Sequence, residues 1–422
     1  MSLRQQPVVS IVSIIGTALA IFLIMLVVMI DQVKYEPFAP ESNRDRWLLY
    51  EYGHLCSREY PDNHSSAGFG YNTVKSVFYK METPEAVTAF KSSPSKASVS
   101  LPHKPAKGFN LLDTDDAFWH VFDFDFISGQ PYTKEDFESG LKKAVISESV
   151  ARSMYGNTDV VGQQLLINHA RYTVVGVVED VSNLSRSAYA DIWVPFTSTV
   201  TVAESQVYGI MGSLSVVILA KDKADFAEIK AECYRLFKDY EKGFSEQGFF
   251  FKHDGQPNSQ MEIAFGIEGA DTYLKVIFKY KYIIFLILLI VPAVNLSSMT
   301  HSRLVRRREE IGVRRAFGAT RGEIAINIFV ECLVITLVAG LIGFVASLLC
   351  GIFCSGLIFD TPPSSNVSNT SNVTFVSLAQ LFHWSTFALS LLFCFILNLL
   401  SAAIPTIGAA RTNVVNAISG KG

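Results

Sequence analysis

Residues 303–331 read RLVRRREEIGVRRAFGATRGEIAINIFVE, and this basic stretch separates two long apolar runs. Residues 301–321 hold two glutamates, Glu309 and Glu310, and seven arginines: Arg303, Arg306, Arg307, Arg308, Arg314, Arg315 and Arg321. Short loops rich in arginine and lysine stay in the cytoplasm. The stretch therefore predicts that the chain crosses a membrane on both sides of it and that the segment itself lies inside.

The same stretch predicts a short amphipathic helix at the cytoplasmic face. Glu309 and Glu310 lie within helical ion-pair reach of the flanking arginines, and apolar residues are interspersed among the charges. Gly318-Ala319-Thr320 then favours a helix break before the membrane is re-entered. These residues alone leave two interpretations equally open, a basic loop that faces lipid and an element that docks a protein.

Working outward, four runs are long enough to cross a bilayer, which takes roughly 20 apolar residues. The charged fraction of 18% is below the roughly 25% of an ordinary soluble domain, and mean hydropathy is +0.28. The first run has 23 residues without a charge, too long for a signal-peptide core, and no A-x-A site follows it, so we expect a retained anchor. The four expected spans are about 8–30, 282–300, 324–353 and 384–407.

Charge placement predicts the topology. Arg4 and the tail residues Arg411 and Lys421 fall on the same predicted side as the arginine-rich loop, so both termini are expected in the cytoplasm. Lys279 and Lys281 run against this bias without reversing it. The expected domains are residues 1–30, an extracytoplasmic domain at 31–275, and a second membrane part at 276–422 that contains the cytoplasmic loop 301–321. The net charge of −3 gives no reason to expect a nucleic-acid partner.

Residues 31–275 are enough for a core and for two subdomains. Apolar periodicity predicts alternating strands and helices: a strand at 75–81, a short helix at 84–91, a strand at 98–102, a strand at 212–220 and a helix at 225–240. These elements are expected to form two βαβ-type halves of one subdomain.

A segment of different texture, about 113–200, is expected to be a second subdomain inserted into the first. It contains AVISESVARSMY at 144–155, with a helix N-cap at Ser147. It also contains a predicted strand pair, 164–168 and 172–178, joined by a short turn at His169-Ala170.

Catalytic signatures are missing from the sequence, which has no G-x-S-x-G, H-E-x-x-H or C-x-x-C. Aromatic residues alternate with an acidic cluster, as in a half-buried strand with a solvated face, and a ligand site is the alternative interpretation; the cluster is Asp113, Asp115, Asp116, Asp123 and Asp125. Cys56 and Cys233 can form a disulfide in an oxidising compartment or remain unpaired. Metal and catalytic residues are therefore expected to be absent.

The pattern R-x-E-I-G-x-x-R-A-x-G-A-[ST]-x-x-x-I, followed by a glutamate, resembles the hallmark of the FtsX/MacB-like ABC permease family. The matching positions are Arg308, Glu310, Ile311, Gly312, Arg315, Ala316, Gly318, Ala319, Thr320, Ile324 and Glu331. In the outer domain, VISESVARSMYGNTDVVGQQLLIN at 145–168 and TVVGVVED at 173–180 are similar to the periplasmic core domain of MacB-type permeases. The order of one helix, a domain and three helices is also that of the family, so the resemblance covers nearly the whole chain.

The resemblance implies an α-helical membrane protein with four transmembrane helices and an α+β extracytoplasmic domain, a MacB-type periplasmic core with a ferredoxin-like porter part and an inserted subdomain. It implies a multi-pass protein of the bacterial inner membrane with the large domain in the periplasm. MacB itself carries a nucleotide-binding domain, whereas these 422 residues contain no G-x-x-x-x-G-K-[ST]. The chain is therefore expected to be no enzyme and to bind no cofactor, while ATP is used by a partner ABC ATPase present in two copies.

The resemblance assigns ATPase coupling to the helix in the arginine-rich loop, with the residues Arg306, Arg307, Arg308, Glu310, Ile311, Gly312, Arg314, Arg315, Gly318 and Ala319. Glu331 lies about two turns into the next span, where an unpaired carboxylate is costly, so pairing with an arginine of the loop is favoured over a transport role. A small-x-x-x-small ladder allows close helix approach, either within the chain or at a dimer seam: Ala339, Gly343, Ser347 and Gly351.

The implied function is mechanotransmission, in which ATP hydrolysis by the partner moves the periplasmic domain, with efflux or export of antimicrobial compounds or peptides as the favoured output. Lipoprotein release and FtsX-like activation of a cell-wall hydrolase are alternatives, and a non-transporting membrane sensor or scaffold is an alternative of another class. Expected partners are the ATPase, a second permease subunit in a homodimer or sibling heterodimer, a periplasmic adaptor, an outer-membrane channel and membrane lipid.

Overall fold

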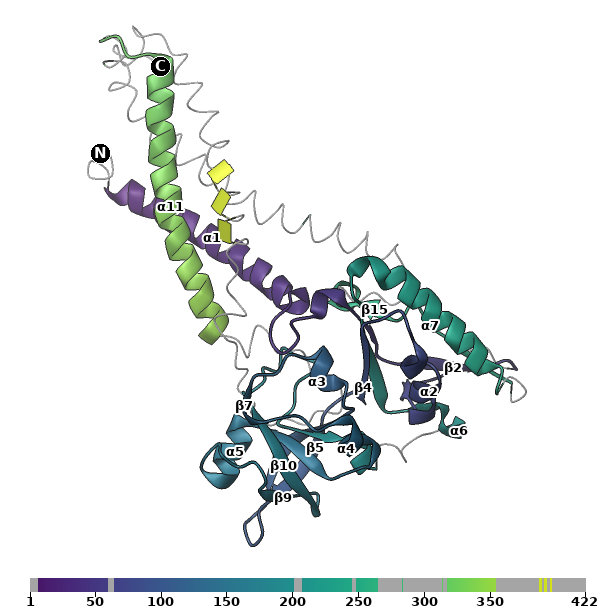
Figure 1. The fold of residues 1–422 in the computed structure, drawn as a ribbon. Helices are drawn as coiled ribbons and strands as arrows, with labels where there is room; N and C mark the ends of the chain where they lie inside the picture. The colour runs from purple at the N-terminus through teal and green to yellow at the C-terminus, as the bar shows by residue number, and fades with distance from the viewer. Residues whose placement is uncertain are drawn as a thin grey trace. The chain divides into compact units, whose positions relative to one another are not determined.

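The computed structural model describes residues 7–59, 64–200, 207–244, 248–264 and 317–353, together with positions 283, 313, 387–388, 391–392 and 395–396. The chain divides into two compact units. One unit comprises Met1–Val33 with Lys275–Gly422, and the other, called the outer domain below, comprises Lys34–Leu274. Figure 1 shows the helices and strands of both.

Two long helices are described in the first unit, α1 (Pro7–Tyr35, whose last two residues belong to the outer domain) and α11 (Arg321–Phe353). Among the described residues, α1 is the one helix long and apolar enough to cross a membrane, with a mean hydropathy of 2.7 in an 18-residue window of Ile14–Tyr35. Leu337–Phe353 of α11 forms a shorter apolar stretch. The expected spans at 282–300 and 384–407 lie outside the described residues, apart from a few single positions.

The outer domain is built on a ferredoxin-like part. Its strands lie in the order β15-β1-β13-β4 and all pair antiparallel. One helix connects β1 to β4 and another connects β13 to β15, which is the split βαβ arrangement. These elements are β1 (Trp47–Tyr50), α2 (Tyr71–Ser76), β4 (Ala86–Lys91), β13 (Leu214–Leu219), α7 (Phe226–Glu241) and β15 (Asn258–Ser259).

A smaller antiparallel sheet, β3-β2-β14, borders this part. Aromatic rings fill the core beneath it, and Tyr50, Phe69, Phe78 and Phe237 meet mostly edge to face at 4.8–5.9 Å, a favourable geometry for aromatic pairs. The shorter elements here are η2 (Arg44–Arg46), β2 (Gly53–Ser57), β3 (His64–Phe69), η3 (Phe78–Lys80), α6 (Val207–Ile210), β12 (Met211–Gly212), η5 (Lys223–Asp225), β14 (Phe249–Lys252) and α8 (Gln260–Ala264).

Between β4 and β13 the chain builds an insertion. Six of its strands pair in a closed ring, β6-β11-β8-β10-β9-β5 and back to β6, and closure removes exposed strand edges. The insertion comprises β5 (Ser95–Ser100), β6 (Lys107–Thr114), α3 (Phe118–Val121), β7 (Phe126–Gly129), α4 (Lys134–Glu138), β8 (Lys143–Ser147), α5 (Glu148–Tyr155), β9 (Gln164–Ile167), β10 (Ala170–Val178), β11 (Ile192–Pro195) and η4 (Phe196–Ser198). Because β5 and β6 belong to the ring, the inserted subdomain begins before position 113, the start expected from the sequence.

A shared core joins the two parts of the outer domain. Trp47 and Val217 of the ferredoxin-like part pack in one buried cluster with Leu112, Val145 and Trp193 of the insertion. Each part also has an apolar cluster of its own. The shared cluster makes a hinge between the two parts costly, because opening it would expose apolar surface at about 25 cal/mol per Å².

Several predicted elements are confirmed. The strand expected at 212–220 is β13, and the helix expected at 225–240 is α7, which buries Ile229, Cys233 and Phe237 at helical spacing. The Ser147 hydroxyl accepts a hydrogen bond from the Val150 amide and caps α5. β9 and β10 pair antiparallel, and the turn between them uses Asn168 and His169 at positive φ.

Two sequence predictions are wrong. The strand expected at 75–81 is the end of α2 followed by η3, and the helix expected at 84–91 contains β4. The six residues of β4 pair with β13 along its whole length. Partner strands thus override local propensity, as they commonly do for short segments.

Of the acidic cluster, Asp113 lies in β6, whereas Asp115, Asp116, Asp123 and Asp125 lie outside any strand. Phe118 to Val121 form the single turn of α3. The Asp115 carboxylate, which lies just before this turn and is only 1% exposed, connects α3 to η3 and β4. It accepts hydrogen bonds from the hydroxyls of Tyr79 (2.6 Å) and Thr88 (2.5 Å) and from the amides of Ala89 (2.7 Å) and Phe118 (3.0 Å). Within the described residues no group of three or more His, Cys, Asp or Glu side chains is arranged to hold a metal ion.

The His253 side chain packs among aromatic residues. Its ring lies 4.7 Å from that of Tyr234 and 4.9 Å from that of Phe237, and its Nδ1 is 2.6 Å from the Tyr50 hydroxyl. Burial lowers the pKa of His253 to about 4, against a weaker opposing effect of Asp254. The neutral imidazole is therefore the form that the fold stabilises.

We expect the stability of the protein to fall as the pH drops from about 6.5 to about 4, because the unfolded imidazole takes up a proton in this range and the folded one does not. The contribution is up to about 3 kcal/mol. His253→Asn keeps an acceptor near the position of Nδ1 without titrating, so it should flatten this part of the pH profile. Thermal unfolding of the full-length protein in detergent, followed by tryptophan fluorescence, measures it. An unchanged slope in the variant would contradict the expectation.

Candidate coupling site in the outer domain

The segment that follows α1 is fixed by a buried ion pair. This leading segment, residues 34–46, connects α1 to β1. Arg44 Nε lies 2.5 Å from Glu41 Oε2, and both side chains are only 2% exposed. The other carboxylate oxygen of Glu41 accepts hydrogen bonds from the amides of Ser187 (2.8 Å) and Ala188 (3.1 Å) in the loop between β10 and β11.

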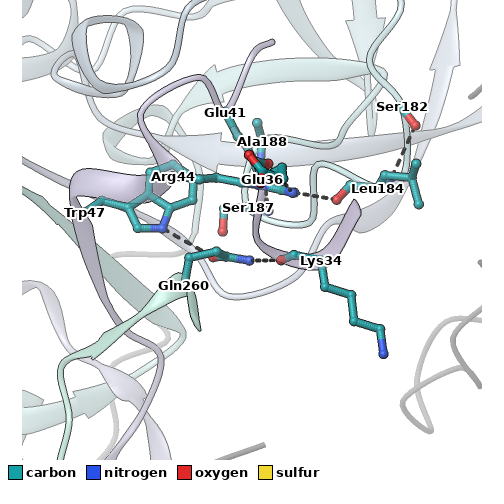
Figure 2. A network of polar contacts seen from close by, with 10 residues as sticks. All are labelled: Lys34, Glu36, Glu41, Arg44, Trp47, Ser182, Leu184, Ser187, Ala188 and Gln260. Atoms are coloured by element: carbon teal, nitrogen blue, oxygen red, sulfur yellow. Dashed lines mark hydrogen bonds and ion pairs between the residues drawn. The ribbon is translucent and has the colours of Figure 1, made fainter. Parts of the chain in front are cut away.

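The Arg44 guanidinium binds the same loop directly. It donates to the carbonyl oxygen of Leu184 at 2.6 Å and to that of Glu36 at 3.4 Å, and it lies 4.1 Å from the centre of the Phe38 ring. Figure 2 shows Glu36 and Leu184 beside the ion pair. A buried ion pair is stable only when further hydrogen bonds satisfy both ions, and here both have them.

Gln260 connects the two ends of the outer domain. Its side-chain amide donates to the carbonyl oxygen of Lys34 at 2.8 Å, and its oxygen accepts from the buried indole of Trp47 at 3.3 Å. Lys34 lies where the chain enters the outer domain, whereas Gln260 begins α8, the last described helix before the chain leaves it. The Gln260 side chain thus connects the segment where the chain enters the outer domain to the segment from which it leaves.

The leading segment also docks on α3. The Asp123 amide donates to the Pro40 carbonyl oxygen at 2.8 Å, the Asn43 side-chain amide donates to the Val121 carbonyl oxygen at 3.0 Å, and Ser42 donates to the Asp123 carboxylate. We call the leading segment, the loop 182–188 and Gln260 together the junction. The junction holds segments in place, and its described residues include no group of three or more His, Cys, Asp or Glu side chains arranged to hold a metal ion.

Most of the predicted coupling residues fall outside the described residues: Arg306, Arg307, Arg308, Glu310, Ile311, Gly312, Arg314 and Arg315. Gly318 and Ala319 are described, and Gly318 adopts φ +97°, which only glycine adopts readily. The Thr320 hydroxyl then accepts from the Glu323 amide (3.2 Å), while Glu323 accepts from the Thr320 amide (2.9 Å). This capping box starts α11 directly after the predicted break.

Glu331 lies on α11, and its side chain is outside the description. Of the predicted ladder, Ala339 and Ser347 are fully buried. At Gly343, α11 approaches α1 so closely that an added Cβ would lie 2.5 Å from the Ala18 carbonyl oxygen and 3.1 Å from Ile21. The contact described at this position of the ladder is therefore one within the chain.

Gly343→Leu is expected to lower the stability of the membrane unit by about 1–3 kcal/mol or more, since the new side chain meets backbone and cannot be accommodated by a rotamer change. Gly322→Ala is the matched control on the same helix. Among the described residues, an added Cβ there meets only the Thr320 hydroxyl, at 4.0 Å, so stability should be unchanged or slightly higher. Retention of the monodisperse peak after heating in detergent measures both, and equal retention would contradict the packing argument.

Cys56 and Cys233 are both buried and free. Burial is the main cause that raises the pKa of each thiol, so both are poor nucleophiles. The junction, by contrast, gave no signal in the sequence, since Arg44 and Glu41 lie three residues apart in an ordinary polar segment. Their partners are about 140 and 145 residues further along, at a separation that no local pattern reports.

Two protein families match most of the chain. The MacB-like periplasmic core domain matches residues 10–234 and the FtsX-like permease C-terminal domain matches residues 282–414. An uncharacterized ABC transporter permease of Bacillus subtilis, YknZ, is 22% identical over 339 residues, which cover 79% of this chain and 80% of the relative. The macrolide export ATP-binding/permease protein MacB of Neisseria gonorrhoeae is 23% identical over 254 residues, which cover 60% of this chain and 37% of the relative.

The chain therefore spans well under half the length of the MacB relative. A solved extracellular domain of the noncanonic ABC-type transporter YknZ from Gram-positive bacteria is 16% identical, with a TM-score of 0.34, over 48% of this chain and 99% of that chain. Family membership places the protein in the inner membrane with its core domain in the periplasm. Since the core-domain match covers more than half of the 422 residues, the chain belongs to the MacB-like periplasmic core domain family and, with its FtsX-like domain, is an ABC transporter permease.

Proposed function

We propose that this protein is the permease subunit of a mechanotransmission system, which converts ATP hydrolysis by a separate ATPase subunit into movement of the outer domain. The observation that carries the proposal is the pairing of a MacB-like core domain with an FtsX-like permease domain in a sequence without a P-loop. The nucleotide site then belongs to a partner, and the permease itself is not an enzyme.

The proposed topology has four transmembrane helices at about 8–30, 282–300, 324–353 and 384–407, with both termini in the cytoplasm. Its support is the apolar character of α1 and of the second half of α11, together with the seven arginines of 301–321. The inserted subdomain and the ferredoxin-like part together form the periplasmic domain.

In this proposal two ATPase subunits dock on two permease subunits through the arginine-rich helix. Arg306, Arg307, Arg308, Arg314 and Arg315 supply the positive charge for an acidic groove, and the glycine at 318 and the capping box of Thr320 end the docking helix before α11 begins. Charge of one sign also speeds association with an oppositely charged partner.

The proposed output is export of antimicrobial compounds or peptides through a periplasmic adaptor and an outer-membrane channel. Support comes from the MacB relatives, which are described as macrolide exporters. A lipoprotein or a cell-wall hydrolase as the target would use the same transmission step and differ only in what the periplasmic domain contacts.

The test is hydrogen exchange in the purified permease–ATPase complex in lipid nanodiscs. We expect exchange in the periplasmic domain, including peptides that cover 182–189, to differ between the nucleotide-free complex and the complex trapped with ATP and vanadate. The isolated permease given the same nucleotides is the control and should show no change. Identical exchange in the trapped and nucleotide-free complexes would exclude mechanotransmission and favour a sensor or scaffold.

A further inference from the structure

We infer that Gln260 and the Arg44–Glu41 pair are positioning residues, which make the junction a clamp that moves the chain entry, the chain exit and the insertion as one body. The inference rests on the proposed function and names the site at which the motion enters the outer domain. A clamp is the alternative to a loose junction in which α1 and the exit segment move independently.

The covalent path has two entrances. The outer domain is the continuous stretch Lys34–Leu274, so only the bonds before Lys34 and after Leu274 attach it to the rest of the chain. Any pull or twist carried by the chain must arrive through one of these two ends. If the ends were independent, opposite motions would distort the domain instead of moving it.

Gln260 connects the two ends of the outer domain, so that they do not move independently. Its two hydrogen bonds, to the Lys34 carbonyl oxygen and from the Trp47 indole, hold the entering end, the start of β1 and the leaving end together. β1 also pairs with β15 next to Gln260 through Leu48–Ser259 and Leu49–Asn258. The side chain therefore extends a two-strand ladder up to the last residues of α1.

The ion pair then carries the connection into the insertion. Arg44 and Glu41 together make three hydrogen bonds to Leu184, Ser187 and Ala188, and salt screens a buried pair far less than an exposed one. Arg152–Glu148 offers the contrast, because its side chains are 62% and 31% exposed and lie four residues apart on one helix. That pair connects nothing beyond α5.

The clamp acts on a stiff body. The shared core around Trp47 and Trp193 packs the insertion against the ferredoxin-like part. Trp47 belongs both to this core and to the Gln260 contact, so the clamp and the core share a residue. A displacement of the leading segment is therefore expected to reach the loop 182–188 undiminished.

Hydrogen exchange of Gln260→Leu in the full-length protein tests the clamp first without nucleotide. We expect exchange to rise about tenfold in peptides covering 36–46 and in those covering 182–189 together, which is what the loss of two net hydrogen bonds implies. Gln163→Leu is the matched control, since Gln163 is exposed and lies outside the junction, and it should change neither. A rise confined to peptides covering 256–264 would overturn the clamp, because a merely local role predicts that pattern.

The second arm uses the ATPase complex. In wild type the nucleotide-dependent change at 182–189 is expected, and in Gln260→Leu it should fall at least severalfold while ATPase binding and ATP hydrolysis continue. An equal response in both proteins refutes the clamp and leaves the proposed function standing. An absent response in wild type refutes the proposed function, and the first arm then still decides whether the clamp exists.

Discussion

Arg44→Met is expected to lower the free energy of unfolding of the outer domain by about 3–5 kcal/mol, because it leaves the buried Glu41 carboxylate without its counter-ion. Methionine retains most of the apolar volume of the arginine stem, so the loss reports the charge and not a cavity. Three of the four tryptophans, Trp47, Trp119 and Trp193, lie in the outer domain. Their fluorescence during thermal unfolding of the full-length protein measures the effect.

Two variants calibrate this result. Arg152→Met removes an arginine from an exposed pair and should cost less than about 1 kcal/mol. Arg44→Met combined with Glu41→Gln removes the orphaned charge and should recover part of the loss, since an amide oxygen can still accept from Ser187 and Ala188. Equal losses in Arg44→Met and Arg152→Met would contradict the assignment of the junction as a buried electrostatic site.

Asp115→Ala is the second large expected effect. It deprives two buried amides, those of Ala89 and Phe118, and the hydroxyls of Tyr79 and Thr88 of their acceptor. Each orphaned amide costs about 1–3 kcal/mol, and rotation lets the hydroxyls recover part of theirs. We expect a loss of about 3–5 kcal/mol in the same unfolding assay, and a loss below 1 kcal/mol would show that this carboxylate is not the hub of its segment.

Asp115 also gives a pH signature of its own. Burial, opposed by its hydrogen-bond donors, raises the pKa of Asp115 to about 7 from an ordinary 3.8. Between about pH 3.8 and pH 7 the folded Asp115 therefore holds a proton that the unfolded Asp115 has lost. The contribution of this group to stability is full below about pH 3.8 and is lost as the pH rises through 7. Asp115→Asn should remove a decline of up to about 4 kcal/mol across this range, which has the opposite sign to the His253 effect. Parallel pH profiles of wild type and Asp115→Asn would contradict it.

Local patterns in the sequence were enough to predict several elements of the outer domain. α7 shows its buried stripe at Ile229, Cys233 and Phe237, and β13 is a continuous apolar strand. The Ser147 cap and the β9–β10 hairpin also depend on neighbours within a few residues. In each case the residues that stabilise the element lie inside it or next to it.

The closed ring of the insertion could not be predicted in this way. It requires β11 to pair with β6 some 80 residues earlier and with β8 some 45 residues earlier, and no local periodicity specifies such partners. The same reason explains why the segment of β4 resembled a helix. The junction is an extreme case, since Glu41 and its partner Ala188 lie 147 residues apart.

For the arginine-rich helix the sequence remains the source of the prediction. Its residues lie outside the described part, apart from Val313 and the turn at Phe317–Gly318 that precedes the capping box. The family matches support a permease and leave the docking residues as a proposal.

The most direct test is co-purification from native membranes in mild detergent, comparing wild type with the Gly312→Arg, Arg315→Glu double variant. Gly312→Arg adds bulk where the motif has none, and Arg315→Glu reverses one docking charge. We expect that a protein with a G-x-x-x-x-G-K-[ST] P-loop and measurable ATPase activity accompanies the wild type and is lost from an equally folded double variant. Well-folded wild-type protein that brings down no ATPase, or a double variant that retains it fully, would contradict the account.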